Sequence, residues 1–366
     1  MKSRNLGRAL TTGTLLTVMS TALGLQAQET IEKLTVSDVD RTYLVRLPRG
    51  YDHVRKYPII ILLHGMHQGA DDMARLTRFG ELADKEGVIA VYPSAQHGQW
   101  NIGVYPEIRR AGPYRRRGGY PGGGYPGGGY PGGGYPGGGY PRRRQPPPDQ
   151  RPGGDEHRTA PADDVEFMNH MLDAMATKYS VASARIYAVG LSEGGFMAMK
   201  VGCAMSDRIA AIGVVGAAMP KKMICLPSRP VPVVMINGTS DPIVPHGGGT
   251  EHNLQLPVVS VEDTAKAWAR DDRCAEKPTH TKLPARAKGG MTTEVDTYAG
   301  CRDGAQVVSY NVKGAGNTWP GGEQYQVEKQ IGKTSQDINA NEILWGFLAA
   351  RKLAPSTPGD TSPSLK

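Results

Sequence analysis

Residues 185–198 read RIYAVGLSEGGFMA, and this stretch decides the fold of the chain. The run RIYAVG has the aliphatic character of a buried strand, and the following EGGFMA opens a helical stretch. Between them, Gly190 to Gly194 fit the pattern G-x-S-x-G. At such a strand–turn–helix junction the serine occupies a sharp turn, with its hydroxyl exposed above the sheet. The pattern predicts that Ser192 is a nucleophile; the alternative is a serine that caps an ordinary helix.

The rest of the chain alternates in the same way between aliphatic runs and helical stretches. One helix is indicated by Val165, Met168, Leu172 and Met175, which recur at spacings of three and four. The expected strands span residues 42–47, 57–64, 88–93, 185–190, 209–216, 231–237 and 307–312. This alternation predicts an α/β fold with a mostly parallel sheet and helices on both faces. Ligands of such sheets lie beyond the carboxyl ends of the strands.

Two backbone amides are expected to bind an oxyanion beside Ser192. The second expected strand ends in the sequence HGMH, where this kind of fold supplies one donor, here the N–H of Met66. The other donor is the N–H of Glu193, directly after the serine. The side chains of His64 and His67 are expected to be structural, because the order along such chains is serine, then acid, then histidine.

An acid follows the expected strand at 231–237. The sequence GTSDP places Asp241 in the loop just after this strand, at the same edge of the sheet as Ser192. An aspartate ahead of a proline is also a common turn residue. We expect Asp241 to be the acid of a catalytic triad.

Four motifs together resemble a known family: HGMHQGA at 64–70, GLSEGG at 190–195, NGTSDPIVP at 237–245 and GNTWPGG at 316–322. In this order they resemble the secreted esterases related to polyhydroxybutyrate depolymerases, feruloyl esterases and acetylxylan esterases. The resemblance covers about Thr35 to Leu353. It implies an α/β-hydrolase fold, with Ser192 as the nucleophile and Asp241 as the triad acid.

One position departs from the family pattern. Asn317 stands in the loop before TWPGG, where the family carries a histidine. An amide cannot take the proton of the serine and return it to the leaving group. Three possibilities stay open. In the first, another histidine supplies the base, either His246, five residues after Asp241, or the more distant His280. In the second, the protein is a slow esterase. In the third, it is a binding protein that keeps the pocket without turnover.

The N-terminus predicts export. Lys2, Arg4 and Arg8 precede an apolar run over residues 9–25, and cleavage is expected after Ala27. The alternative is a single membrane anchor, for which the run is short. No other long apolar run follows. The mature chain is therefore expected in the periplasm or outside the cell, without stable membrane insertion.

Four cysteines in an exported protein indicate two disulfides. Three connectivities are possible, and proximity in the sequence favours Cys203–Cys225 and Cys274–Cys301. The family resemblance supports the same pairs. No CxxC motif or Cys/His cluster occurs, so we expect neither a metal site nor a cofactor.

The pentad GGGYP repeats between arginine-rich flanks within residues 109–152. Glycine and proline in this proportion cannot build a packed core, so a disordered insertion is expected. Its nine arginines and one aspartate carry a net charge of +8, which equals the formal charge of the whole chain. The segment is either a tolerated surface loop or an arm whose Tyr and Arg side chains hold an aromatic or anionic polymer. Export argues against nucleic acid as the partner.

These expectations divide the chain into a signal peptide (1–27), a hydrolase domain (28–354) interrupted by the insertion at 109–152, and a disordered tail (355–366). The expected function is that of a secreted serine esterase. It would cleave carboxylic esters of a polymer or its fragments, with an impaired or relocated base. The alternative is a non-catalytic extracellular protein that binds a polymer with the same fold. Hydroxyalkanoate, feruloyl and acetyl esters are all compatible with the motifs.

Overall fold

The structure is a computed structural model that describes residues 27–104, 163–286 and 288–354. The insertion, the tail and the expected signal segment up to residue 26 lie outside these residues. The strands are β1 (Gln28–Val36), β2 (Val39–Leu47), β3 (Tyr57–Leu63), β4 (Ile89–Pro93), β5 (Val181–Leu191), β6 (Ala211–Val215), β7 (Val233–Gly238), β8 (Gly249–Thr250), β9 (Pro257–Val258), β10 (Thr279–Leu283), β11 (Thr293–Tyr298) and β12 (Val307–Val312). The α-helices are α1 (Ala70–Thr77), α2 (Phe79–Glu86), α3 (Asp164–Lys178), α4 (Glu193–Ala204), α5 (Val261–Asp271), α6 (Glu328–Ile331) and α7 (Ala340–Leu348).

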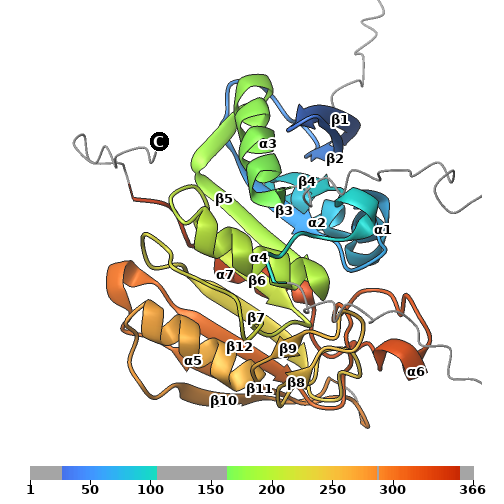
Figure 1. Cartoon of the computed structure of the whole chain (residues 1–366), viewed down its shortest axis with the longest axis vertical. Coiled ribbons are helices and arrows are strands. Elements are labelled where there is room, and N and C mark those ends of the chain that lie inside the picture. Colours follow the sequence, from blue (N-terminus) through green and yellow to red (C-terminus); the bar gives the residue numbers. More distant parts are fainter. Residues whose placement is uncertain (1–26, 105–162, 287, 355–366) are drawn as a thin grey trace, which may run out of the picture.

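Ten of these strands form one twisted sheet (Figure 1). Their order is β1-β2-β4-β3-β5-β6-β7-β12-β11-β10. From β4 to β12 every neighbouring pair is parallel. Both edges are antiparallel, through β1, β2 and β4 on one side and β12, β11 and β10 on the other. The predicted mostly parallel sheet is confirmed, with antiparallel margins that the sequence does not predict.

The centre of the sheet is its most apolar part. β3 reads YPIIILL, and all seven residues are buried, as expected of a strand covered by helices on both sides. The edge strands β1 and β10 are mostly exposed. Neither strand has the aliphatic run from which a buried strand is predicted. Each is held by antiparallel pairing, β1 with β2 and β10 with β11.

Helices cover both faces of the sheet, which confirms the α/β class. In Figure 1, α3, α4 and α5 lie in front of the sheet and α7 lies behind it. Phe167 of α3, Met197 of α4 and Trp268 of α5 belong to one buried apolar cluster. Phe79 of α2 and Leu344 of α7 belong to the other. The parallel strands are thus buried on two sides, and this requirement explains their uninterrupted aliphatic sequences.

The two chain segments that flank residues 105–162 lie side by side. The backbone N–H of Asn101 donates to Oδ2 of Asp164 at 2.6 Å. The other oxygen of Asp164 pairs with Arg41 of β2, and both of these side chains are almost fully buried. Loss of one partner would leave a buried charge without compensation, at a cost of about 3–5 kcal/mol. This contact therefore fixes the start of α3 against β2.

Both expected disulfides are present. Cys203, near the end of α4, is bonded to Cys225, and Cys274, just after α5, is bonded to Cys301. The first ties the loop between β6 and β7 to α4, and the second ties α5 to the loop between β11 and β12. Among the described helices, none has the length and apolar character needed to cross a membrane.

Removal of either disulfide should lower the free energy of unfolding. The two bridges span 22 and 27 residues, and the chain-entropy relation assigns about 3 kcal/mol to loops of this size. We expect a loss of this order in the double variants Cys203→Ala/Cys225→Ala and Cys274→Ala/Cys301→Ala, measured by urea unfolding. Unchanged unfolding midpoints in both variants would contradict the expectation.

Candidate active site

Ser192 lies at the junction of β5 and α4 in a strained backbone conformation. Its φ is 56° and its ψ is −118°, a region that residues other than glycine rarely adopt. Its N–H donates to the carbonyl oxygen of Val215 at 2.8 Å, and its own carbonyl accepts the N–H of Gly195 and Phe196 in the first turn of α4. The side chain makes no capping hydrogen bond. An ordinary helix cap therefore does not explain this serine.

Two glycines make the turn possible. A Cβ on Gly190 would lie 1.9 Å from the carbonyl oxygen of Gly194, and a Cβ on Gly194 would lie 2.2 Å from that of Leu63. No side chain fits at such distances. The turn is thus packed directly against the end of β3. Its two glycines occupy the positions at which the sequence pattern requires them.

Two backbone N–H groups at this turn are available to bind an oxyanion. Within the described residues, neither Met66 nor Glu193 donates its N–H to a partner. Gly65 lies against the end of β5, since its Cβ position is 3.6 Å from the carbonyl oxygen of Leu191. The carbonyl of Gly65 points to Nδ1 of His64 at 2.7 Å. In a trans peptide the next N–H points the opposite way, so the Met66 N–H is directed away from that ring.

His64 orients the backbone and is not a base. The side chain is fully buried, and Nε2 accepts the N–H of Ala95 at 3.0 Å. The proton therefore resides on Nδ1, which donates to the carbonyl of Gly65. Burial lowers the pKa of His64 and keeps the ring neutral. Both ring nitrogens are engaged with the backbone, so none remains for proton transfer.

Asp241 and Asn317 form the central polar contact of the site. Nδ2 of Asn317 donates to Oδ2 of Asp241 at 2.7 Å and to the carbonyl oxygen of Gly216 at 2.8 Å. The other oxygen of Asp241 accepts the N–H groups of Ile243 and Val244, both at 2.8 Å. Asn317 is fully buried. The loop after β7 and the loop after β12 are therefore joined through this pair.

Two consecutive residues, Val215 and Gly216, connect Ser192 to the pair of Asp241 and Asn317. Val215 accepts the N–H of Ser192, and the next residue, Gly216, accepts the side chain of Asn317. The structure thus gathers Ser192, Asp241 and Asn317 at the carboxyl edge of the sheet, the edge at which the sequence places them. We refer to these three residues as the candidate triad.

Asn317 brings to the candidate triad no group that can accept the serine proton. Nδ2 of Asn317 is bonded to Asp241 and Gly216, and its Oδ1 is buried without a partner. An amide oxygen is far too weak a base for a hydroxyl proton. Burial raises the pKa of Asp241 to about 7, against the opposing effect of the hydrogen bonds from Val244 and Asn317.

The two histidines considered as substitute bases take part in another network. Nε2 of His246 lies 2.9 Å from Oδ1 of Asn311, whose Nδ2 reaches Oδ2 of Asp296 at 3.3 Å. Oδ1 of Asp296 lies 2.9 Å from Nδ1 of His280. Within the part of the chain that the structure describes, neither histidine hydrogen-bonds to the candidate triad.

Two buried carboxyl groups beside the candidate triad, those of Glu193 and Glu251, are not predicted from the sequence. Burial raises the pKa of Glu193 to about 8, against the opposing effect of a hydrogen bond from the backbone N–H of Trp100. Oε2 of Glu193 has no partner among the described residues. Burial also raises the pKa of Glu251, whose charge in turn favours the protonated forms of Glu193 and Asp241. Glu193 belongs to a motif that predicts only the role of its backbone, and Glu251 belongs to no motif. No group of His, Cys, Asp and Glu in the described residues is arranged to hold a metal.

Comparison with known proteins supports the family resemblance. The profile of the family described as esterase PHB depolymerase matches residues 41–112. NocK of Nocardia uniformis subsp. tsuyamanensis, which is named as an esterase, is 25% identical over 88% of this chain and 83% of its own length. Feruloyl esterase B of Piromyces equi is 30% identical over 43% of this chain and 29% of its own length. Among solved structures, the acetyl xylan esterase from Aspergillus awamori is 11% identical with a TM-score of 0.47, covering 79% of this chain and 94% of that one.

The resemblance expected from the motifs is thus confirmed: the chain is similar to esterases of the PHB depolymerase type. The segment matched by the family profile contains Met66, the first candidate oxyanion donor. It ends before Ser192, so the roles of the candidate triad depend on geometry and on the motifs.

Substitution of Gly194 by alanine should disrupt the serine turn. The added methyl group would overlap the backbone of Leu63, and overpacking against rigid backbone costs up to about 3 kcal/mol. The matched control is Gly346→Ala in α7, where nothing lies within 4 Å of the added Cβ and helix propensity favours alanine. Thermal unfolding should show a lower Tm for Gly194→Ala and an equal or higher Tm for Gly346→Ala. An equally mild effect at both positions would contradict the close packing.

Stability should fall as the pH rises from about 4 to about 7, in part because of Asp241. Its pKa is raised from 3.8 to about 7 in the folded state, so the folded chain binds more protons than the unfolded chain in this range. Burial of Asp272, which raises its pKa to about 7, acts with the same sign. Asp241→Asn should therefore weaken the decline without abolishing it, as measured by urea unfolding between pH 4 and pH 8. Identical slopes for wild type and variant would refute the assignment.

Proposed function

We propose that this protein is a serine hydrolase that cleaves carboxylic esters, with Ser192 as its nucleophile. The observation that carries the proposal is the strained turn at Ser192, held between two glycines that tolerate no side chain. Backbone strain of this kind costs about 1–3 kcal/mol and clusters at functional sites. The similarity to proteins named as esterases supports the same class of reaction.

In the proposed reaction the hydroxyl oxygen of Ser192 attacks the ester carbonyl, and negative charge develops on the carbonyl oxygen. The N–H groups of Met66 and Glu193 would bind this oxyanion, each being worth roughly 2.7–4 kcal/mol in a water-excluded site. The alcohol leaves with a proton, and an acyl-enzyme forms on Ser192. Water then hydrolyses the acyl-enzyme and restores the serine.

Asn317 would preserve the geometry of a triad without its proton transfer. Its Nδ2 donates to Asp241 as a ring N–H would, but it presents no basic nitrogen to Ser192. A site without its base retains about 10³–10⁴-fold acceleration over water, from the oxyanion hole and binding. We favour a slow esterase over a relocated base, because His246 and His280 are hydrogen-bonded into the network of Asn311 and Asp296.

The proposed substrates are esters of a polymer or of its fragments. Among the relatives are a feruloyl esterase and a bifunctional acetylxylan esterase/xylanase, and the matching family is named after PHB depolymerases. Two disulfides suit an oxidising compartment, so we propose that the chain acts outside the cytoplasm. The insertion at 109–152 would serve as an arm that contacts aromatic or anionic polymer.

A second candidate is a binding protein that retains the cleft without turnover. The amide at position 317 favours this possibility, because its side chain supplies no basic atom to a nucleophile. Fluorophosphonate labelling separates the two candidates: an activated Ser192 reacts with the probe, and the hydroxyl of an inert site does not.

Asn317→His should raise kcat on a short-chain aryl ester by about 10²–10⁴-fold, the range typical of a positioned acid–base group. The imidazole would donate one N–H to Asp241 and present its second nitrogen to the serine. The matched control is Asn237→His. Asn237 is also buried, donates to a backbone carbonyl and has an unpartnered Oδ1, yet it does not bond to Asp241. Only the change at position 317 should increase the rate.

Two outcomes would refute this account of the site. A wild-type rate that His246→Ala abolishes would assign the base to His246. An Asn317→His variant that folds but stays inert, with Ser192 unlabelled in both forms, would establish the binding protein instead.

A further inference from the structure

The side chain of Glu193 lies inside the protein, although this residue begins helix α4. It is only 3% exposed, so it is not one of the solvated acids that commonly occupy the first turn of a helix. One carboxyl oxygen accepts the backbone N–H of Trp100, and Oε2 has no partner among the described residues. The backbone N–H of Glu193 is one of the two proposed oxyanion donors. The buried carboxyl group therefore belongs to the same residue as a group that would contact the substrate.

Trp100 extends the contact to the loop that carries the other donor. Its indole N–H donates to the carbonyl oxygen of His64 at 2.8 Å, and its ring packs on the neutral ring of His64, with the centroids 4.8 Å apart. The ring of His64 in turn donates to the carbonyl of Gly65 at 2.7 Å. This carbonyl and the N–H of Met66 belong to one planar peptide group. Three hydrogen bonds thus connect the carboxyl group of Glu193 to the peptide group that presents the Met66 N–H.

The segment 95–101 is bound to both of the elements between which it lies. On one side, the N–H of His67 donates to the carbonyl oxygen of Gly98 at 2.8 Å. On the other side, Lys200 of α4 donates to the carbonyl oxygen of Asn101 at 2.7 Å, and Figure 1 shows the chain passing beside this helix. A change in the position of this segment would therefore move the loop after β3 relative to α4.

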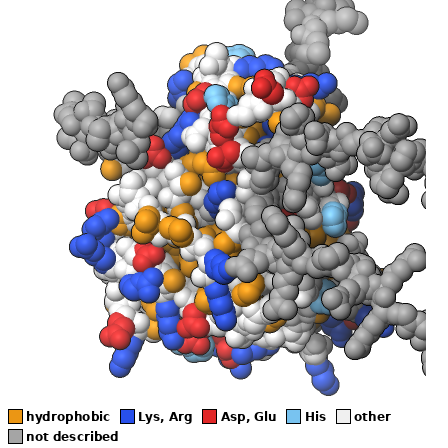
Figure 2. Space-filling model, viewed as in Figure 1, with side chains coloured by type: hydrophobic (Ala, Val, Ile, Leu, Met, Phe, Trp, Pro, Cys, Tyr) orange, Lys and Arg blue, Asp and Glu red, His pale blue; other side chains and the backbone are white. Residues whose placement is uncertain are grey.

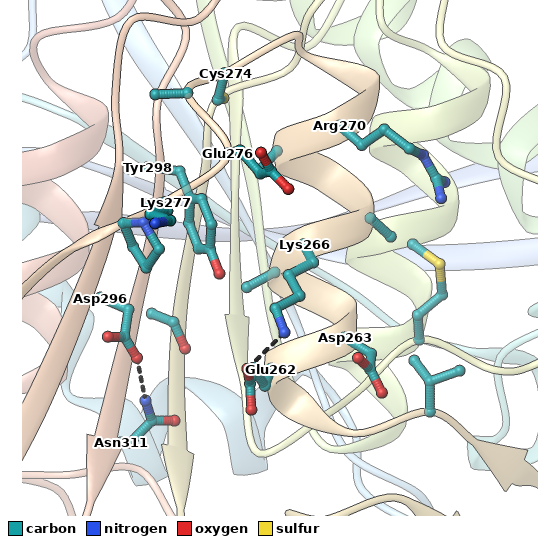
Figure 3. Close-up of a pocket in the computed structure, with 18 of the residues that line it drawn as sticks. Glu262, Asp263, Lys266, Arg270, Cys274, Glu276, Lys277, Asp296, Tyr298 and Asn311 are labelled. Atoms are coloured by element: carbon teal, nitrogen blue, oxygen red, sulfur yellow. Dashed lines mark hydrogen bonds and ion pairs between the residues drawn. The ribbon is translucent and has the colours of Figure 1, made fainter.

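The carboxyl group of Glu193 acts on the protein itself and not on a bound ligand. The groove of about 1190 Å³ beside α5, drawn in Figure 3, is lined by neither Glu193 nor Trp100. Oε2 is enclosed by the protein, so a substrate cannot reach it. Any effect of this side chain on the site must be exerted through its hydrogen bond to Trp100.

The interior of the protein sets the charge of Glu193. Burial raises the pKa of this carboxyl group to about 8, so it is neutral at pH 7. Two other carboxyl groups act in the same direction: Glu251, just after β8, and Asp164, whose charge is paired with that of Arg41. On the face seen in Figure 2, the acidic and basic side chains of the described residues are interspersed, without a large patch of one sign. A neutral carboxyl group accepts the N–H of Trp100 without placing a negative charge beside the oxyanion.

We propose that Glu193 is a positioning residue, whose carboxyl group holds the segment at Trp100 and thereby fixes the direction of the Met66 N–H in the oxyanion hole. One residue then supplies an oxyanion donor from its backbone and positions the other donor with its side chain. The effect on rate rests on the proposed ester hydrolysis. The effect on the loop requires no turnover.

Hydrogen exchange of the full chain, followed by mass spectrometry, tests the contact without a substrate. The N–H groups of Gly65, His67 and Gln68 are hydrogen-bonded, so their exchange reports opening of the loop. Glu193→Leu removes the acceptor at similar volume, whereas Glu193→Gln keeps it. Residues 64–68 should exchange about 2–10-fold faster in Glu193→Leu than in Glu193→Gln, the range for one net hydrogen bond.

The matched control is the pair Asp272→Leu and Asp272→Asn. Asp272 is also a buried carboxyl group with a raised pKa, which accepts one backbone N–H and has one oxygen without a partner. It lies directly after α5 and outside this connection, so its two variants should exchange equally over residues 64–68. A second variant, Trp100→Phe, breaks the next hydrogen bond of the connection and should speed the same exchange as Glu193→Leu does.

Kinetics with a short-chain aryl ester separate positioning from a purely structural role. The kcat of Glu193→Leu should be about 10–10²-fold below that of Glu193→Gln, because complete loss of an oxyanion donor costs about 10²–10³-fold. KM should be similar, since the oxyanion forms only in the transition state. The ratio of kcat for Glu193→Gln to kcat for the wild type should be constant near pH 6. It should rise by up to about tenfold per pH unit above 8, where only the wild-type carboxyl group ionises and opposes the oxyanion.

Equal exchange over residues 64–68 in the two Glu193 variants overturns the proposal, as does unchanged exchange in Trp100→Phe or an equal increase in Asp272→Leu. If the wild type hydrolyses the ester, equal kcat values for Glu193→Leu and Glu193→Gln also overturn it. Absence of both hydrolysis and fluorophosphonate labelling would instead refute the proposed function, and hydrogen exchange would still decide the role of Glu193.

Discussion

The approach of the Gly194 backbone to the end of β3 is the constraint on which the other features of the site depend. Because the carbonyl of Leu63 leaves no room for a side chain, α4 begins directly against the centre of the sheet. The chain must then reverse sharply at Ser192, and only a strained backbone achieves this. The same packing brings the loop after β3, with its N–H at Met66, to the serine. The buried aliphatic strands supply the rigidity that such strain requires.

The pair of Asp241 and Asn317 shows how much of a triad an amide can imitate. A side-chain N–H replaces the donor that an aspartate in such a site needs, so the carboxyl group remains satisfied. The unfavourable part of this arrangement is Oδ1 of Asn317, which is buried without a hydrogen-bond partner. Asn317 therefore supplies the hydrogen bond that the folded site needs, but it supplies no base for the proposed reaction.

The sequence predicts the centre of this protein better than its margins. The strand at 57–64, the serine turn and the loop with Asp241 have strong local patterns, and the structure places them as expected. The edge strand β10 is exposed, so nothing in its composition reveals it. Glu251 belongs to no motif, and its burial beside Glu193 and Asp241 depends on tertiary packing alone. The partners of His246 could not be predicted either, because Asn311 lies 65 residues away.

The contact of Asn101 with Asp164 has a consequence for how this gene can vary. It brings the two sides of the repeat-bearing connection together, so a disordered insertion, as expected from the sequence, would leave the number of GGGYP units uncoupled from the geometry of the domain. The entropy of closing a loop grows only with the logarithm of its length, and one more pentad in a connection of this size would cost about 0.1 kcal/mol. Replication slippage in the repeat would thus produce length variants whose folding stability is almost unchanged. Any selection on repeat number must act through what the repeats contact.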